Sequence, residues 1–375
     1  MLRYLTAGES HGPCLIAVME GMVAGLPINI AAVNHELARR QAGHGRGGRM
    51  LIEKDQAAFL SGIRQHVTIG SPIAIQVINR DFKINELPVI VRPRPGHADL
   101  SGALKYGRSD VRDILERASA RETAVRVAVG AVAKQFLSAF GVDITSHIVE
   151  IGGIKAPALE AAVHRIRNLS EKSPVRCADA GTTRRMIRLI DRTKKDRNTI
   201  GGVFEVLADG VVCGIGSHAQ YDRRLNAVLA FAVMSIQAVK GVEIGLGFHV
   251  ARLPGSRAHD EIYYSKAAKR FFRKTNRAGG IEGGMSNGER LVLRGATKPY
   301  ATLMRPLSSV NIKTKQTQVA TIERSDVTAV PACGVIAEAV VAFELARLYL
   351  EKFGGDSLKE TLKNYHSYVK SIKNF

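Results

Sequence analysis

The stretch 224–240 is apolar on nearly every side of the helix that its spacing predicts. A helix on a protein surface keeps a polar face, so this one must lie between other elements. Two more long helices are expected, at 109–140, where apolar residues recur at helical spacing, and at 335–353. Each of the three is followed by a helix-ending glycine, at Gly141, Gly241 and Gly354. The chain is therefore expected to fold around internal helices.

Four shorter runs predict strands, at 15–19, 68–78, 202–212 and 291–293. Their short spacing and hairpin-type links indicate antiparallel sheets packed on the buried helices, an α+β arrangement. The segments 141–144 and 241–244 each open an alternating stretch directly after a helix, which suggests an internal pseudo-twofold repeat. No linker divides the chain, so 1–375 is expected to form a single integrated domain, with 356–375 as a surface C-terminal tail.

Composition and cysteine spacing bear on where the protein resides and on whether it binds a metal or a membrane. Hydrophobic residues make up 45% of the chain and charged residues 23%, which is typical of a globular protein. The first residues lead directly into a glycine turn and leave no room for a signal peptide. No apolar run reaches the roughly 20 residues that span a bilayer. The four cysteines form no C-x-x-C pair, which argues against zinc or a disulfide framework. We expect a cytoplasmic protein with no metal site and no membrane partner.

The formal net charge of +20 predicts an anionic partner. Nucleic acid, an anionic membrane surface and small phosphate- or carboxylate-bearing substrates all fit such a charge. Arginines crowd into glycine- and proline-rich loops, which favours a small substrate. The chain has no Trp and only 6% aromatic residues, poor material for stacking bases, so nucleic acid is an unlikely partner. The basic clusters at 184–197 and 266–277 resemble solvated surface, and their surplus charge has no explanation in the sequence.

The pentapeptide 8–12 places Ser10 and His11 between two glycines. Glycine reaches backbone angles that other residues adopt only at a cost, so these side chains can be held in a sharp turn. Histidine ionises near neutral pH, which suits proton transfer. The alternative is a turn with a solvent-exposed histidine.

The segment 39–49 contains four arginines, and its glycines have a G-x-G-x-x-G spacing. A dinucleotide fingerprint follows a strand, whereas this segment follows the helical pattern of 34–40, so a Rossmann site is rejected. The segment is better explained as a loop whose guanidinium groups grip a phosphate or carboxylate. A merely solvated basic loop is the alternative.

Three further segments suit anion or proton chemistry. The loop 92–99 is stiffened by two prolines and holds His97 between a Pro-Gly turn and an aspartate. Arg117 and Arg121 share a helix face, where their repulsion would be relieved partly by Glu122 and otherwise by a bound anion. The glycine-rich segment 279–288 can cradle a phosphate or approach a flat ring, but it is not a P-loop.

Together and in this order, these motifs resemble those of the chorismate synthase family, from Gly8 to about Tyr368. The resemblance implies a helical layer sandwiched between antiparallel sheets and a homotetramer. It also implies anti-1,4-elimination of phosphate from 5-enolpyruvylshikimate 3-phosphate to give chorismate, a lyase reaction that requires reduced FMN. The substrate and FMN are anionic, which agrees with the positive charge.

The resemblance also assigns residues. His11 would protonate the departing phosphate, His97 would serve the flavin near its N1–C2=O edge, and Asp326, with Ser10 and Ser119, would manage the proton at flavin N5. Arg40 and Arg46 match arginines linked to NADP or to substrate anions. The flavin contacts would be Arg117, Ala118, Ser119, Gln237, Ala238, Gly283, Lys298, Pro299, Tyr300, Ala301, Thr302 and Arg324.

Three positions depart from the family pattern. Tyr300-Ala301-Thr302 replaces sequences such as Thr-Ser-Ser, Gln237 stands where Asn is common, and His44 stands where Tyr is frequent. Two other functions stay open: a basic nucleic-acid-binding protein, and a flavin reductase that consumes NADPH one for one with product. NADPH is also an open alternative as the reductant that keeps FMN reduced.

Overall fold

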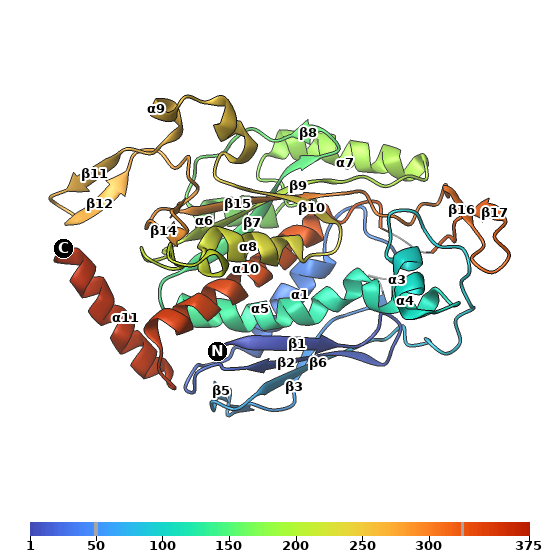
Figure 1. Cartoon of the computed structure of the whole chain (residues 1–375), viewed down its shortest axis with the longest axis horizontal. Helices are drawn as coiled ribbons and strands as arrows, with labels where there is room; N and C mark the ends of the chain where they lie inside the picture. The colour runs from blue at the N-terminus through green and yellow to red at the C-terminus, as the bar shows by residue number, and fades with distance from the viewer. Residues whose placement is uncertain (49–51, 324–325) are drawn as a thin grey trace.

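A computed structural model describes residues 1–48, 52–323 and 326–375. Three helices, α1, α5 and α10, form a central layer between two antiparallel sheets (Figure 1). The central helices are α1 (Ile30–Gln41), α5 (Thr123–Ser138) and α10 (Val330–Phe353). The four-stranded sheet runs in the order β1 (Arg3–Ala7), β2 (Cys14–Glu20), β6 (Ile73–Ile78), β3 (Ala57–Phe59). The five-stranded sheet runs in the order β10 (Val239–Ile244), β15 (Leu291–Thr297), β9 (Gly202–Asp209), β7 (Asp143–Ile151), β8 (Ile154–Lys155). The expected α+β sandwich is confirmed.

Shorter elements surround these layers. The remaining helices are α3 (Asp99–Tyr106), α4 (Arg112–Ala118), α6 (Val163–Glu171), α7 (Ala180–Lys195), α8 (Leu225–Met234), α9 (Gly255–Ala258) and α11 (Leu358–Lys373). The 3-10 turns are η1 (Ala120–Glu122), η2 (Tyr221–Arg223) and η3 (Gly247–Arg252). The hairpins are β4–β5 (Ile63–Arg64, Val67–Thr68), β11–β12 (Ile262–Ser265, Arg270–Arg273), β13–β14 (Ile281–Glu282, Met285–Ser286) and β16–β17 (Ser308–Val310, Thr317–Val319). The β11–β12 hairpin projects from one end, opposite the end with α3 and α4 (Figure 1).

The central helices approach one another closely. A Cβ added at Gly130 of α5 would lie 2.3 Å from the Cβ of Ala339 on α10, so only glycine permits this packing. Most of α10 is buried along its 24 residues. Among the described residues, no helix combines the length and the apolar character that crossing a bilayer requires.

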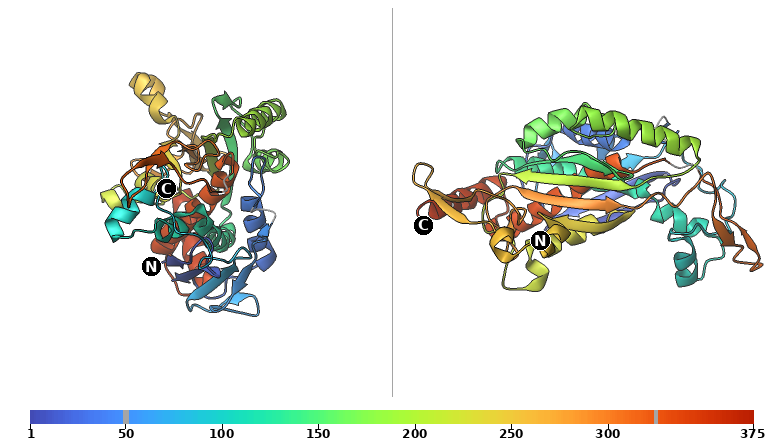
Figure 2. Two further views of the ribbon diagram at one scale, coloured as in Figure 1. Left: turned by 90° about the vertical axis from the view of Figure 1, so that its right-hand side faces the viewer. Right: turned by 90° about the horizontal axis from the view of Figure 1, so that it is seen from above.

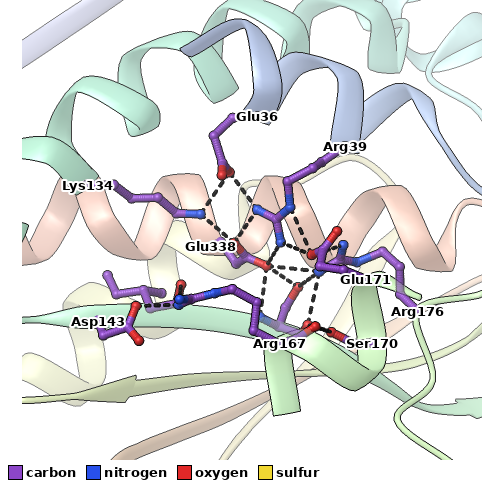
Figure 3. A network of polar contacts seen from close by, with 11 residues as sticks. Glu36, Arg39, Lys134, Asp143, Arg167, Ser170, Glu171, Arg176 and Glu338 are labelled. Atoms are coloured by element: carbon purple, nitrogen blue, oxygen red, sulfur yellow. Dashed lines mark hydrogen bonds and ion pairs between the residues drawn. The ribbon is translucent and has the colours of Figure 1, made fainter. Parts of the chain in front are cut away.

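A network of buried ion pairs also joins the central helices. Glu338 of α10 is fully buried and accepts hydrogen bonds from Arg39 of α1 and Lys134 of α5 (Figure 3). Arg39 pairs in addition with Glu36 and Glu171, at 2.7 Å and 2.6 Å. Buried charges are costly unless every partner is present, so this network fixes the position of α1 against α10.

The helix expected at 109–140 is wrong as one continuous element. The chain forms α4, η1 and α5, and the break lies at Ser119, which has φ −63° and ψ 141°. The Ser119 hydroxyl accepts a hydrogen bond from the backbone N–H of Arg121, which caps the next turn. The apolar periodicity continues across the break, which explains why the sequence pattern conceals it.

The helix expected at 224–240 is shorter, and its complete enclosure is wrong within this chain. It ends at Met234, because Ala238 takes a positive φ of 72° and β10 begins at Val239. The side chains of Phe231 and Met234 are 72% and 47% exposed. One face of α8 therefore packs against the core while the other carries large apolar side chains outward.

The other sequence expectations differ at their boundaries. The helix expected at 335–353 begins earlier, at Val330, with Pro331 in its first turn. The strand expected at 68–78 is divided between β5 and β6, whereas the other three expected strands fall in β2, β9 and β15. The strands expected to open at 141–144 and 241–244 are β7, which begins at Asp143, and β10, which begins earlier, at Val239. The pseudo-twofold repeat and the single domain stay predictions.

The segment 356–375 forms α11, which is exposed over most of its length. One face nevertheless packs on the protein, since Thr361 is fully buried and the rings of Tyr365 and Tyr368 contact Phe353. The expected surface tail is therefore a helix anchored along one side.

Candidate active site

One cavity of about 320 Å³ gathers side chains from segments that lie far apart in the sequence. It is lined in part by α4 and η1, at the end of the molecule that faces the viewer in the left panel of Figure 2. Of the residues expected from the sequence, the cavity brings together Ser10, His11, Arg40, Arg46, His97, Ser119, Tyr300, Ala301, Thr302 and Asp326. Further lining residues include Asp81, Lys83, Arg94, Arg121 and Glu323.

His11 is held by a turn that needs glycine. Gly8 has φ +106°, and a Cβ there would lie 2.3 Å from the carbonyl oxygen of Cys14. The His11 side chain is only 17% exposed, so the solvent-exposed turn is excluded. The hydroxyls of Ser10 and Ser119 lie 3.2 Å apart in the same cavity, with Ser119 as donor.

Glu116 of α4 orients the His11 ring. Its Oε1 lies 2.9 Å from His11 Nδ1, and its Oε2 accepts the His11 backbone N–H at 2.8 Å. Burial would raise the pKa of the Glu116 carboxyl, but the hydrogen bonds from His11 and the nearby Arg112 hold it below its ordinary value. An ionised carboxylate only accepts, so the hydrogen of this bond is carried by His11 Nδ1, and Nε2 is the ring nitrogen on the side of Asp81, which lines the cavity.

His97 has a comparable carboxylate partner. Its Nδ1 forms a very short hydrogen bond with Asp99, a fully buried residue at the start of α3. Arg94 also pairs with Asp99, at 2.8 Å, and donates to the Thr302 hydroxyl at 2.8 Å. Burial opposes ionisation of Asp99, but His97 and Arg94 together lower the pKa of its carboxyl far below the ordinary value. The stiff loop therefore presents His97 in a fixed orientation.

The arginine-rich loop after α1 is fastened to the segment that precedes α10. Arg46 lies 2.7 Å from the Asp326 carboxylate, which also accepts the backbone N–H of Gly47 at 2.5 Å. The backbone N–H of Val327 donates to the carbonyl of Gly45 at 2.8 Å. The loop is thus not merely solvated: it packs against the protein and directs Arg46 into the cavity.

Arg40 is buried beside the cavity. Its guanidinium donates to the Thr123 hydroxyl and to the Ala120 carbonyl, both at 2.9 Å. Burial, opposed by Asp55 and reinforced by neighbouring arginines, lowers the pKa of Arg40 to about 10. Because the Arg40 cation is poorly solvated at this buried position, an anion that enters the cavity stabilises it.

The expected repulsion between Arg117 and Arg121 is wrong. The helix breaks at Ser119, so the two side chains diverge. Arg117 donates to the main-chain carbonyls of Thr6 and Gly8, whereas Arg121 pairs with buried Asp55 at 2.6 Å. Asp55, rather than Glu122, supplies the internal counter-charge of Arg121.

A chain of hydrogen bonds links two of the expected flavin contacts, Arg117 and Gln237. Arg117 donates to the Thr6 hydroxyl at 2.7 Å, and that hydroxyl donates to Glu122 at 2.9 Å. Glu122 in turn accepts from the Gln237 side chain at 3.2 Å. The Gln237 carbonyl oxygen is buried and has no hydrogen-bond partner among the described residues. It lies beside a small cavity of about 30 Å³ that Arg40, Arg46 and Tyr300 also line.

Other expected flavin contacts do not line the main cavity but lie close to residues that do. Lys298 bonds to the carbonyl of Gly96, next to His97, and burial followed by repulsion from Lys240 lowers the pKa of Lys298. The backbone N–H of Lys298 donates to the carbonyl of Ala238 at 2.9 Å. Ala118 and Pro299 are backbone neighbours of the lining residues Ser119 and Tyr300.

The expected contact Gly283 lies away from the cavity. Gly283 lies in the β13–β14 turn, where the neighbouring Gly284 accepts a hydrogen bond from Leu225 at the start of α8. Gln237 lies just beyond the opposite end of α8, a ten-residue helix ~15 Å long. Gly283 and Gln237 are therefore separated by about the length of this helix. Arg324 lies outside the described residues.

The sequence analysis missed Glu116, Asp55, Asp81 and Lys83. Arg112 and Glu116 are four residues apart on one helix, a spacing at which opposite charges pair, but nothing local connects Glu116 to His11. The contacts of Asp55 and Asp81 depend on tertiary structure. Among the described residues, no group of three or more His, Cys, Asp or Glu side chains is placed to hold a metal ion.

Comparison with known proteins bears on the fold and on the family of this chain. The family model described as chorismate synthase matches residues 2–350. A chorismate synthase of Geobacter metallireducens is 55% identical over 393 residues, with both chains fully covered. That of Desulforamulus reducens is 52% identical over 388 residues, covering 99% of this chain and 100% of the relative. A crystal structure of a chorismate synthase superposes with a TM-score of 0.83 at 43% identity, covering 100% of this chain and 99% of the other.

Proposed function

The chain belongs to the chorismate synthase family, and on this premise we propose that the cavity around His11, His97 and Asp326 is where it acts. It is a carbon–oxygen lyase that converts 5-enolpyruvylshikimate 3-phosphate to chorismate and phosphate, the last step of the shikimate pathway. The observation that carries the proposed site is the convergence of two carboxylate-paired imidazoles and several guanidinium groups on one cavity.

The positive side chains would hold the substrate. It carries one phosphate and two carboxylates, and guanidinium groups keep their charge while pairing with such anions. Arg46, Arg94 and Arg121 line the cavity beside Lys83. Arg40 is committed to Thr123 and Ala120, so we assign it to the electrostatic field of the site and Arg46 to direct contact.

Proton transfer would fall to three side chains. In the elimination, the C–O bond to phosphate breaks with its electron pair, C6 loses a proton, and the ring gains a second double bond. His11, with Nε2 facing the cavity, would donate a proton to the departing phosphate. Asp326, with Ser10 and Ser119 nearby, would manage the proton at flavin N5, and His97 would donate to the flavin near its N1–C2=O edge.

Reduced FMN is the cofactor that we propose, and it would supply electron density to the breaking C–O bond and take up the C6 proton. Its fit is supported by the buried Gln237 carbonyl oxygen, an acceptor that suits a ring N–H. The hydrogen-bonded row from Arg117 to Gln237 would flank the ring. Ala118, Ser119, Ala238 and residues 298–302 would complete the contacts.

NADPH is a separate question, because it could serve only to keep FMN reduced. A flavin reductase would consume NADPH one for one with product. Incubation with FMN and NADPH, with and without an added flavin reductase, distinguishes an enzyme that reduces its own flavin from one that receives reduced flavin.

We propose a homotetramer. Two apolar surfaces support it: the outer face of the four-stranded sheet, where Leu5 is 78% exposed beside Val18, and the exposed side of α8 with Phe231. A cytoplasmic location is proposed as well, supported by four cysteines that are all unpaired.

Anaerobic turnover tests the function. The protein is incubated with substrate, FMN and dithionite, and chorismate is followed by its absorbance while phosphate is quantified. We expect one phosphate for each chorismate and no turnover with oxidised FMN in the absence of a reductant. Product formation with oxidised FMN alone would contradict the cofactor assignment.

A further inference from the structure

The contact between His11 and Glu116 is unusually complete. The two carboxylate oxygens of Glu116 bind two different groups of His11, the ring Nδ1 and the backbone N–H. In addition, the backbone N–H of Ser10 donates to the Glu116 carbonyl at 3.0 Å. Three hydrogen bonds therefore connect the turn at residues 8–12 to Glu116 of α4.

Glu116 is itself fixed. Its side chain is 1% exposed, and Arg112, one turn earlier on α4, approaches Oε1 at 3.3 Å. Arg112 also donates to the Pro88 carbonyl at 2.8 Å and pairs with Glu323. A carboxylate held this way cannot follow the histidine if the ring turns, so it determines the ring orientation.

We propose that Glu116 is the positioning residue of the reaction: it selects the Nδ1-protonated form of His11 and aims Nε2 at the departing phosphate. This inference rests on the proposed role of His11 as proton donor. Glu116 lies behind the ring and acts only through it.

The proton-donating form of His11 is the cationic imidazole, in which both ring nitrogens carry a hydrogen, so Nδ1 can bond Glu116 while Nε2 gives its proton. Asp81 lies on the other side, with Oδ2 3.7 Å from Nε2, which is beyond hydrogen-bond distance. Lys83 pairs with Asp81 at 2.6 Å and offsets its charge. Glu116 is thus the carboxylate that bonds the ring directly.

A double-mutant cycle tests the proposal. Glu116→Gln replaces the carboxylate with an amide that can bond Nδ1 in either sense, so the ring form is no longer selected. We expect kcat to fall roughly 10-fold or more while KM changes less than about threefold. In a His11→Ala background the same substitution should change kcat by less than about twofold, since the ring through which Glu116 acts is absent.

Two variants guard against a purely structural effect. Glu205→Gln breaks a matched histidine–carboxylate pair, His147 Nε2 to Glu205 Oε1 at 2.9 Å, which lies outside the cavity. It should lower stability and leave kcat within about twofold. If the Glu116→Gln protein does not fold, Glu116→Asp takes its place in the double-mutant cycle. This substitution keeps a negative charge beside Arg112 but moves it away from His11.

The outcomes are distinct. An equal loss of kcat from the Glu116 substitution in both backgrounds overturns the positioning role, because the residue then acts by another route. Near-normal turnover of His11→Ala overturns the proton donor on which the inference rests. A loss confined to the background that contains His11 supports both.

Discussion

Arg39 and Arg40 leave the last turn of α1 toward different partners. The Arg39 guanidinium lies 2.8 Å from Glu338 in the interior of the helical layer, whereas that of Arg40 lies 2.9 Å from Thr123 beside the cavity. One turn of helix therefore couples the buried ion network to the site. A change in that network displaces a cation that the site depends on.

Glu338→Gln should be strongly destabilising. The substitution leaves Arg39 and Lys134 beside an uncharged group in the interior, and breaking a buried pair in this way costs about 3–5 kcal/mol. Thermal and denaturant unfolding would measure the loss. Glu20→Gln, which removes the exposed partner of Arg3, is the control and should change stability by less than about 1 kcal/mol. Equal effects would show that burial does not govern this pair.

The same network predicts acid lability. Burial opposes ionisation of Glu338, but Arg39 and Lys134 hold its pKa well below the ordinary 4.5. A depressed folded-state pKa contributes stability that is present above the unfolded value and is lost as pH falls below it. The melting temperature should therefore drop steeply below about pH 4.5. The Glu338→Gln protein should show a shallower decline. Parallel pH profiles for the two proteins would contradict this source of acid sensitivity.

His11→Ala removes the proposed proton donor. Turnover should fall by roughly 10²-fold or more, as expected when a general acid is lost. FMN binding, followed by flavin fluorescence, should persist, because none of the contacts that we assign to the ring involves this side chain. Near-normal turnover would remove His11 from the mechanism.

Gln237→Ala tests the cofactor wall. Loss of one neutral hydrogen bond should weaken FMN binding about 3- to 10-fold. Gln237→Asn retains the amide and is the matched control, with a smaller loss. Fluorescence titration with FMN gives both dissociation constants. If the Gln237→Ala protein binds FMN as tightly as the wild type does, the buried carbonyl oxygen of Gln237 does not face the flavin.

Phe231→Glu tests the proposed assembly. A carboxylate on the apolar side of α8 would have to be desolvated in an interface, which should shift the tetramer to smaller species. Light scattering after size-exclusion chromatography measures the mass. Tyr221→Glu, at a position that is 80% exposed just ahead of α8, is the control. A wild-type protein that is monomeric at all concentrations would contradict the assembly.

The sequence predicts the parts of the fold that have local causes. The glycine that follows α10 and the apolar spacing within α5 are enough to place these helices. The break at Ser119 is hidden, because a serine hydroxyl that caps a turn competes with helix hydrogen bonds without changing the apolar pattern. The end of α8 depends on a positive φ at Ala238, a non-glycine residue whose sequence gives no sign of it.

The residues of the site also differ in whether the sequence alone reveals them. His11 and His97 stand out because they occupy glycine- and proline-shaped turns, and the motif order adds the family's assignments. Glu116 and Asp55 do not stand out, since each meets its partner only after segments distant in sequence have packed. Charge partners across a fold leave no local trace, so the sequence analysis overestimated the repulsion between Arg117 and Arg121.

The most direct test is a crystal structure of the protein with 5-enolpyruvylshikimate 3-phosphate and FMN. The account predicts that the bridging oxygen of the phosphate ester lies within about 2.6–3.2 Å of His11 Nε2, with Arg46 on a substrate anion. Substrate bound elsewhere, with the His11 ring facing away from it, would contradict the account.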